Sequence, residues 1–393
     1  MSALFLKLVN TSISASWFIL AALVLRLGLR KAPKWVSVAL WGLVAVRLVC
    51  PVTLESALSL IPSAQTIPLD IAMDTTPAIQ SGVPVINQVV NPAIVGSNTP
   101  APGASVNPLQ ITVAVLANVW ALGAAAMLVY TAVSYIRLRR RVFAAVRLRD
   151  HIYQSEAVTS PFVLGLFAPK IYLPFRMEEG DMAHVIAHEQ AHIRRRDHWW
   201  KPLGFALLSV HWFNPLMWLA YILLCRDIEL ACDEKVIQAL EHDARADYSQ
   251  ALLSCAADRR LIAACPLAFG EVGVKERVKS VLSYKKPAFW LVVLAVAACA
   301  AAGVCFLTDP VTPLEAQGRI TGYGISADPV SGRESYHVRV EDLELDCTKE
   351  QHLDVVTYMG YVREGVIVER GTHDELYAAN GVYRHLCDMQ KTD

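Results

Sequence analysis

The sequence predicts a mainly α-helical, polytopic membrane protein with a polar domain inserted between its transmembrane helices. Hydrophobic residues make up 54% of the 393 residues and charged residues only 18%, a mixture outside the range of soluble globular domains. The apolar residues are concentrated in runs long enough to cross a bilayer, which requires about 20 residues. The formal net charge is zero, so no overall positive field indicates direct binding of nucleic acid.

Two transmembrane helices are predicted within residues 1–52. Residues 8–25 are long and apolar enough to span, and a second apolar run, residues 35–52, follows. Basic residues lie between the two runs, namely Arg26, Arg30, Lys31 and Lys34. Because basic residues favour the cytoplasmic side, the first helix enters from outside and this connection is cytoplasmic.

An extracellular loop and a third transmembrane helix come next. Residues 53–110 contain no Lys or Arg and many Pro, Ser, Thr, Asn and Gly residues, as expected of an outside loop that is disordered in part. Residues 111–136 are apolar, and Arg137, Arg139, Arg140 and Arg141 follow at once. The third helix therefore returns the chain to the cytoplasm.

Residues 137–286 are predicted to form a cytoplasmic domain with a small β element. In residues 160–174, SPFVLGLFAPKIYLP, β-branched and aromatic residues alternate around Gly165 and Pro169, which predicts a strand, a turn and a second strand. A helix with a period of 3.6 residues follows, and Asp181 can cap its start.

An apolar segment inside this domain, residues 202–225, permits two interpretations. It contains no Asp, Glu, Lys or Arg, and its length allows a complete crossing. Pro215, however, removes a backbone hydrogen bond and disfavours helix at Asn214, so a hairpin that dips into the membrane competes with a span.

The last transmembrane helix is predicted at residues 287–307. Basic residues precede it and Asp309 follows it, so the chain leaves the cytoplasm there and residues 308–358 form a short extracellular segment. We therefore expect a multi-pass protein of the cell membrane, with its polar domain on the cytoplasmic side.

The polar domain contains His188-Glu189-Gln190-Ala191-His192, which matches H-E-x-x-H on a helix. Residues four apart lie on one helical face, so His188 and His192 can converge on one Zn²⁺. Glu189 lies beside them, where it can act as the general base. His184 and His188 have the same spacing, but that register offers no such carboxylate. The structural alternative is a surface helix with two satisfied histidines.

A catalytic zinc site needs a third protein ligand, and Glu229 is the candidate. Glu229 and Asp233 are four residues apart directly after the apolar segment, so Glu229 can bind the metal while Asp233 accepts a hydrogen bond from a zinc histidine. Asp197 can orient a ligand in the same way, but its spacing favours a surface ion pair with Arg194. The alternative for the acidic residues is a solvated helix face.

The metal site favours the hairpin over a complete crossing. If residues 202–225 crossed once, Glu229 would lie about 30 Å from His188 and His192, on the other side of the membrane. A hairpin keeps all three ligands on the cytoplasmic side.

These residues resemble the BlaR/MecR-type membrane zinc metallopeptidases. The resemblance covers residues 1–307 and rests on ordered motifs, namely WGLVAVRLVCP, SPFVLGLFAPKIYLP, HEQAHIRRRDHWWK, HWFNPLMW, ELACDEKV and FGEVGVKERVKSVL. It implies a gluzincin-type cytoplasmic zinc domain in which His188, His192 and Glu229 hold zinc and Glu189 is catalytic. It also implies that an outside signal triggers cleavage of the protein itself or of a transcriptional repressor, with the substrate peptide laid along the strand in residues 160–174.

The sequence departs from the antibiotic-sensing members of that family. Those members carry a penicillin-binding domain after the last span, with a reactive Ser in S-x-x-K. Here S-x-x-K occurs only at Ser283–Lys286, on the inner side, and K-T-G is absent. We therefore do not expect β-lactam sensing, and the activating signal stays open.

The C-terminal tail, residues 359–393, has a different resemblance. The stretch REGVIVERGTHDELYAANGVYRHLCDMQ is similar to the end of an ABC-exporter nucleotide-binding domain. No G-x-x-x-x-G-K-[ST] occurs in the chain, so ATP binding is not expected. We interpret the tail as a gene fusion or an assembly artefact.

The function predicted is that of a zinc endopeptidase in regulatory signalling, with a protein substrate and the lipid bilayer as partners. The alternative is a catalytically inert receptor or scaffold with a structural metal, in which Glu189 would have no use. An ABC-exporter fragment lacks a phosphate loop, and a transporter lacks paired repeats. Arg259-Arg260 is a candidate point of self-cleavage.

Overall fold

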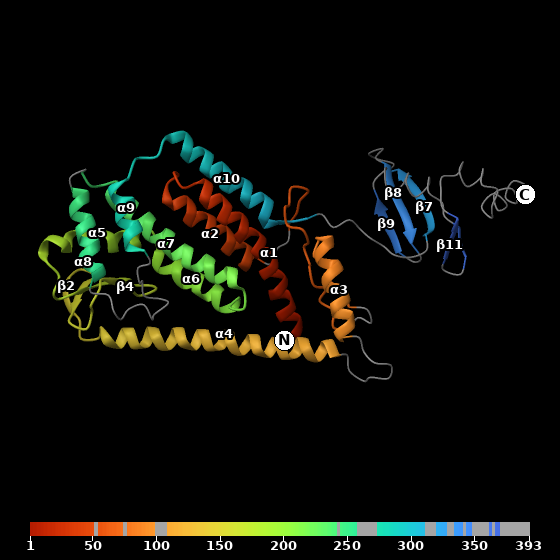
Figure 1. Cartoon of the computed structure of the whole chain (residues 1–393), viewed down its shortest axis with the longest axis horizontal. Coiled ribbons are helices and arrows are strands. Elements are labelled where there is room, and N and C mark those ends of the chain that lie inside the picture. Colours follow the sequence, from red (N-terminus) through yellow and green to blue (C-terminus); the bar gives the residue numbers. More distant parts are fainter. Residues whose placement is uncertain are drawn as a thin grey trace, which may run out of the picture. The chain divides into compact units, whose positions relative to one another are not determined.

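The computed structural model describes residues 1–50, 54–73, 77–98, 108–241, 244–257 and 273–310, together with strands between residues 320 and 369. The chain divides into two compact units, Met1–Val311 and Thr312–Asp393. In the first unit (Figure 1) the helices are α1 (Ser2–Gly28), α2 (Lys34–Val49), α3 (Pro84–Asn98), α4 (Pro108–Arg141), α5 (Glu179–Arg194), α6 (Asp197–Val210), α7 (Pro215–Ile237), α8 (Ala244–Ala257), α9 (Val274–Leu282) and α10 (Phe289–Leu307).

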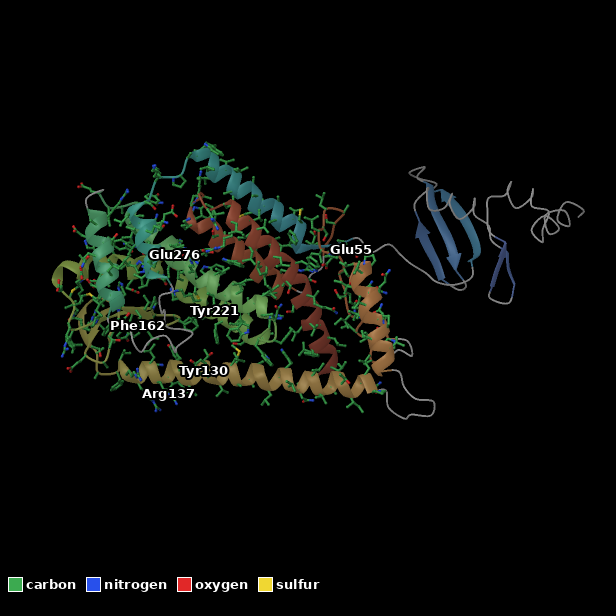
Figure 2. All side chains as sticks on the ribbon, in the orientation of Figure 1. Glu55, Tyr130, Arg137, Phe162, Tyr221 and Glu276 are labelled. Atoms are coloured by element: carbon green, nitrogen blue, oxygen red, sulfur yellow. The ribbon has the colours of Figure 1, made fainter. Side chains whose placement is uncertain are left out.

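Three of the described helices are long and apolar enough to cross a membrane, namely α1, α4 and α10. On α4, the side chain of Val129 is exposed. That of Tyr130 (Figure 2) is exposed too, as is expected of a helix that faces lipid. The second predicted span forms α2, which has 16 residues and is not among the three. Pro33 precedes α2 and Cys50 is already extended, so the helix spans about 24 Å at 1.5 Å per residue.

Helices α1, α2, α6, α7 and α10 share one apolar core. Its fully buried members include Phe18 of α1, Leu40 of α2 and Leu208 of α6. Phe18 also stacks on Phe306 of α10, with ring centroids 5.3 Å apart. The core therefore ties the N-terminal helices to the helices on which the polar domain is built.

The apolar segment at residues 202–225 forms a helical hairpin of α6 and α7. Pro215 is the first residue of α7, where its missing N–H breaks no helical bond, and the Asn214 side chain caps the helix by accepting from Leu216 N at 2.9 Å. Asn214 Nδ2 also donates to Ser12 and Ser16 of α1 at 2.8 and 2.9 Å. The Asn-Pro pair thus reverses the chain and anchors the reversal on α1.

A small four-stranded sheet lies between α4 and α5, in the strand order β2-β3-β5-β4. Its strands are β2 (Val146–Arg149), β3 (Ile152–Ser155), β4 (Phe162–Leu164) and β5 (Lys170–Pro174). The antiparallel pair of β4 and β5 confirms the strand, turn and strand predicted for residues 160–174. Gly165 has φ +120°, and a Cβ there would lie 2.4 Å from Ala168 O, so this turn requires glycine. Strand β4 is an edge strand of the sheet.

Residues 53–110, predicted as an outside loop, contain an unpredicted helix, α3. The side chains of Asn87 and Asn91 accept hydrogen bonds from Ser81 N and Ile79 N, which fixes the start of α3 against the preceding segment. Nearby, β1 (Leu54–Glu55) pairs in parallel with β6 (Thr308–Asp309). Sequence reasoning missed α3 because Pro92 lies inside it, and proline is disfavoured in the interior of a helix.

The second unit is described through its strands alone. Strands β7 (Ile320–Ala327), β8 (Glu334–Val340) and β9 (Leu343–Cys347) form an antiparallel meander, and β10 (Tyr361–Arg363) pairs with β11 (Val366–Glu369). Most of the tail, residues 359–393, lies outside the described residues, as does the predicted cleavage point Arg259-Arg260.

Candidate metal centre

Helix α5 presents His188, Glu189 and His192 toward the interior of the polar domain. All three are buried. The Nε2 atoms of His188 and His192 lie 3.1 Å apart, because residues four apart stand one above the other on a helix. The H-E-x-x-H spacing therefore directs both imidazoles to one point.

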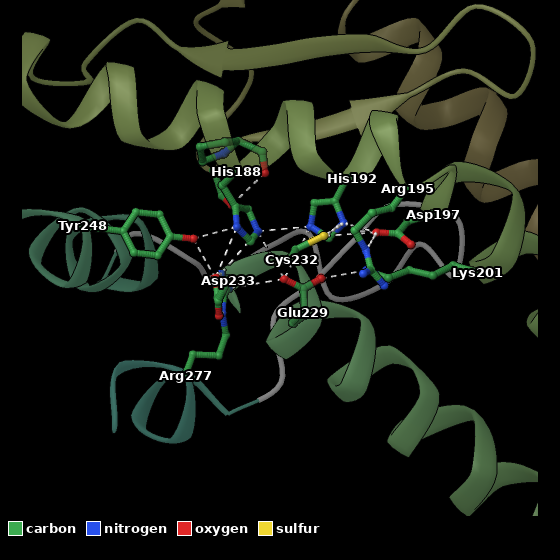
Figure 3. Close-up of polar contacts among 12 residues, drawn as sticks. His188, His192, Arg195, Asp197, Lys201, Glu229, Cys232, Asp233, Tyr248 and Arg277 are labelled. Carbon is green, nitrogen blue, oxygen red and sulfur yellow. Dashed lines mark hydrogen bonds and ion pairs between the residues drawn. The ribbon is translucent and has the colours of Figure 1, made fainter. Parts of the chain in front are cut away.

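Glu229 completes the group from α7. Its Oε2 lies 3.5 Å from Nε2 of His188 and 3.6 Å from Nε2 of His192 (Figure 3). Two ligand atoms bound to one tetrahedral zinc ion at about 2.0–2.2 Å lie about 3.3–3.6 Å apart. The three side chains therefore have the chemistry and the spacing that a zinc ion requires, although their assignment as ligands stays a prediction.

The Nδ1 atoms of both histidines point away from this centre and contact other side chains. Nδ1 of His188 lies 2.9 Å from the Tyr248 hydroxyl and 3.2 Å from Asp233 Oδ1, and Nδ1 of His192 lies 2.9 Å from Asp197 Oδ2. Such partners orient the imidazole rings so that both Nε2 atoms face the centre. Nε2 of His188 also lies 3.3 Å from a terminal nitrogen of Arg277. Asp233 and Asp197 thus stand where an orienting role was predicted.

The favoured interpretation of Asp197 from the sequence, a surface ion pair with Arg194, is wrong. Asp197 is fully buried at the first residue of α6, where it contacts His192 and lies 3.4 Å from Nε of Arg195. Arg196 in the left-handed conformation (φ 59°) turns the chain between α5 and α6. This turn directs Asp197 inward, which helical spacing alone does not anticipate.

Two buried cations complete the centre, and sequence reasoning missed both. Lys201 Nζ lies 2.7 Å from Glu229 Oε1, and a terminal nitrogen of Arg277 lies 3.3 Å from Glu229 Oε2. Arg277 also donates two hydrogen bonds of 2.7 Å to Asp233 (Figure 3). Arg277 is 44 residues from Asp233, so no local spacing could have revealed the pair; Lys201, the last charge before the apolar segment, was the one available signal.

The charges of the centre are mutually compensated. Burial alone raises the pKa of Glu229, but Lys201 and the two histidines hold that pKa well below its usual value. Burial alone lowers the pKa of His192, but Glu229 and Asp197 raise it to about 9. Asp233 likewise keeps a lowered pKa because Arg277 outweighs its burial. The carboxylates are therefore ionised at neutral pH, as metal ligands must be.

Cys232, on α7, is a further buried neighbour. Its Sγ lies 3.1 Å from both His192 Nδ1 and Asp197 Oδ2. Burial, together with the Asp197 carboxylate, raises the pKa of this thiol well above its usual value, so it stays protonated and donates to Asp197. The metal is accordingly expected on the Nε2 side of His192.

Glu189 borders a small cavity beside the centre. The cavity has a volume of about 20 Å³, and His184, His188 and Tyr248 also line it. A single ordered water needs about 10–15 Å³. The cavity can therefore hold one water molecule next to the Glu189 carboxylate and His188.

A larger groove of about 570 Å³ borders edge strand β4. Val163 and Leu164 of β4, together with Gly165, line one part of it, and His198 and Pro202 of α6 line another. The ring of Phe167 is 85% exposed there. An edge strand beside a partly apolar groove offers both backbone hydrogen-bonding groups and side-chain contacts to an extended peptide.

Comparisons with known proteins identify the family of this chain. The family model described as BlaR1 peptidase M56 matches residues 6–281, more than two thirds of the chain. The methicillin resistance mecR1 protein of Staphylococcus aureus is 27% identical over 141 residues, and the regulatory protein BlaR1 of Bacillus licheniformis is 25% identical over 194 residues. These alignments cover 34% and 42% of this chain but only 24% and 32% of the relatives.

The family match confirms the resemblance that the sequence motifs indicated. M56 peptidases are metallopeptidases, and the three long apolar helices identify a membrane protein. The chain belongs to the BlaR1 peptidase M56 family.

Proposed function

We propose that this chain is a multi-pass membrane zinc endopeptidase of regulatory signalling. It cleaves itself or a cytoplasmic repressor-like protein in response to an extracellular signal. The observation that carries the proposal is the spacing of 3.1–3.6 Å between the ligand atoms of His188, His192 and Glu229, with Glu189 beside them. The names of the relatives connect them with regulation and with methicillin resistance; we carry over the regulatory role and leave the signal open.

The residues of the centre divide the work of peptide hydrolysis. A zinc ion held by His188, His192 and Glu229 would supply Lewis-acid chemistry, which makes water nucleophilic at neutral pH. Glu189 takes the proton of the attacking water and gives it to the leaving amine. Asp197 and Asp233 keep the imidazole rings oriented through their Nδ1 atoms.

The substrate in this proposal is an extended peptide that adds to the edge of β4. The unpaired backbone groups of an edge strand bind such a peptide whatever its sequence, and pockets along the groove select its side chains. Gly165 and Phe167 border the groove, so we expect a preference for apolar residues near the cleavage point.

The site lies on the cytoplasmic side in this proposal. The basic residues that follow α4 and those that precede α10 flank the polar domain, and basic residues favour the cytoplasmic face. The α6–α7 hairpin keeps Glu229 on the same side as His188. The exposed indoles of Trp199, Trp200 and Trp218 suit a hairpin that meets lipid headgroups.

Helix α7 is the element that links the transmembrane helices to the metal centre. Residues 227 and 234 lie on one face of α7, and residues 229 and 233 lie on nearly the opposite face. The Asp227 carboxylate accepts hydrogen bonds from Arg26 of α1, whose Nε lies at 2.8 Å and whose terminal nitrogen lies at 2.7 Å. It also accepts one from the indole of Trp41 of α2 at 2.9 Å. A movement of α1 or α2 would therefore displace Glu229, which is how a signal from outside could reach the metal.

The test compares the unchanged protein with Glu189→Gln and with a control, Glu178→Gln, at the exposed residue preceding α5. Each is expressed in membranes, and bound zinc and the fragments of the chain are measured. We expect equal zinc in all three proteins and a self-cleavage fragment that is about 10²–10⁴-fold less abundant in Glu189→Gln alone.

Two outcomes would contradict the proposal. Equal fragments in Glu189→Gln and the unchanged protein, with zinc bound, would favour the inert receptor with a structural metal. Absence of bound zinc in the unchanged protein would remove the metal centre itself.

A further inference from the structure

A basic cavity of about 560 Å³ lies between the α1–α2 connection and the α9–α10 connection, apart from the metal centre. Five cationic side chains line it: Arg30, Lys31, Lys34, Lys285 and Lys286. One carboxylate also lines it, that of Glu234, which accepts a hydrogen bond of 2.6 Å from the backbone N of Lys34. The cavity thus carries a local excess of positive charge in a chain whose net charge is zero.

The described neighbours do not neutralise this charge. Within the described part of the chain, Arg30, Lys31, Lys285 and Lys286 form no ion pair with a carboxylate. The adjoining cavity, of about 660 Å³, adds Lys279, while its acidic residues are already paired, Asp227 with Arg26 and Glu276 with Arg226. Cations held together without partners repel one another, so an anion bound among them is stabilised.

The cavity lies at the level of the lipid headgroups. Helix α10 begins at Phe289, three residues after Lys286, and the side chains of Phe289 and Trp290 are 83% and 63% exposed. Trp35, one residue after Lys34, is 46% exposed. Exposed indoles at the ends of apolar helices mark the membrane interface.

An apolar surface continues from the cavity toward the membrane interior. Pro287, Ala288 and Leu291 line the cavity on the side of α10. One turn after Leu291 on α10, the side chain of Leu294 is 54% exposed. A ligand with a phosphate and an acyl chain fits both parts, because the cations bind the phosphate and the helix surfaces contact the chain.

We propose that this cavity binds the phosphate of an anionic phospholipid of the phosphatidylglycerol class. Arg30, Lys31, Lys285 and Lys286 bind the phosphodiester, and the Ser280 hydroxyl at the cavity wall contacts the headgroup. Basic pockets between helices on the cytoplasmic side have the same chemistry as other anionic-lipid sites. The site does not depend on the peptidase activity, so it can be tested without it.

The test uses the full-length protein with bound metal in a neutral detergent. Thermal unfolding is followed while phosphatidylglycerol, phosphatidylcholine or inorganic phosphate is added, since a ligand that binds only the folded state raises the melting temperature. We expect a rise with phosphatidylglycerol alone. A rise with inorganic phosphate of the same size would overturn the lipid assignment in favour of a free-anion site, and an equal rise with phosphatidylcholine would overturn charge recognition.

Two matched triple variants locate the site. Lys31→Gln/Lys285→Gln/Lys286→Gln removes cavity charges, and Arg137→Gln/Arg140→Gln/Arg141→Gln removes three exposed charges at the end of α4, outside the cavity. The first should weaken phosphatidylglycerol binding about 100-fold, because each basic residue near the surface contributes about fivefold; the second should bind as the unchanged protein does. Equal losses of phosphatidylglycerol affinity in both variants would show that basic surfaces attract the lipid without a specific site. An unchanged affinity in the first variant would show that the cavity is not the site.

Folding is checked by the same measurement. The substituted lysines and arginines are all exposed, so both variants should melt without lipid at the temperature of the unchanged protein and retain its zinc content. If the cavity triple melts lower, the double variant Lys285→Gln/Lys286→Gln replaces it, with an expected loss of about 25-fold. Unchanged lipid affinity in the double variant would refute the proposal.

Discussion

The substitution Tyr248→Phe tests whether the residues that surround the metal centre hold its ligands in place. The Tyr248 hydroxyl has one hydrogen, which it donates to Asp233 Oδ1 at 2.7 Å. It therefore accepts from Nδ1–H of His188, at 2.9 Å. This arrangement leaves the Nε2 lone pair of His188 for the metal. The substitution removes one oxygen atom and leaves the buried ring in place.

The expected magnitude follows from the bonds that are lost. Asp233 keeps its two hydrogen bonds from Arg277, so its charge stays compensated. His188 loses the closer of its two Nδ1 partners and keeps Asp233 at 3.2 Å. A hydrogen bond to a charged group contributes about 1.5–3 kcal/mol. Loss of a residue that orients a zinc ligand costs about 10–100-fold in metal affinity, which is about 1.4–2.7 kcal/mol.

The assay is competition for zinc between the purified protein and a chromophoric chelator in detergent. Tyr284→Phe is the matched control, because the Tyr284 hydroxyl accepts an exposed hydrogen bond from Gln238 at 3.2 Å, away from the metal ligands. We expect zinc affinity to fall 10–100-fold in Tyr248→Phe and to stay unchanged in Tyr284→Phe. An unchanged affinity in Tyr248→Phe, or equal losses in both, would refute the orienting role.

Three further predictions concern the transmembrane link, the charges of the centre and the β4 turn. Asp227→Asn weakens the paired hydrogen bonds from Arg26 and should lower stability by about 1–3 kcal/mol; an unchanged melting temperature would contradict the link. The pKa of His192 is raised to about 9, so the protonated imidazole stabilises the fold when a chelator has removed the metal. This stabilisation is complete below about pH 6.5 and is lost as pH rises through 9. Melting temperatures across that range, with and without zinc, test this, and a rise with pH in the stripped protein would contradict it. Gly165→Ala places a Cβ 2.4 Å from Ala168 O at φ +120° and should destabilise the fold by about 1–3 kcal/mol, whereas equal stability would mean that the turn relaxes.

Local sequence determined the parts of this protein that depend on spacing along one element. The placement of His188, Glu189 and His192 on one face needs helical geometry alone. The alternation around Gly165 sufficed for the β4–β5 pair, and apolar length sufficed for the spans that became α1, α4 and α10. In each case the relevant interaction lies within one element or between neighbours in the chain.

Other features were decided by contacts between distant segments. Glu229 reaches the histidines because Asn214 and Pro215 reverse the chain in a hairpin, a choice that the sequence left open until the metal site was considered. The direction of Asp197 depends on the left-handed Arg196, and Tyr248 and Arg277 come from helices that only packing brings to His188. Short-range periodicity carries no information about such partners, because a buried hydrogen bond between residues 60 or 89 positions apart leaves no mark on the local pattern.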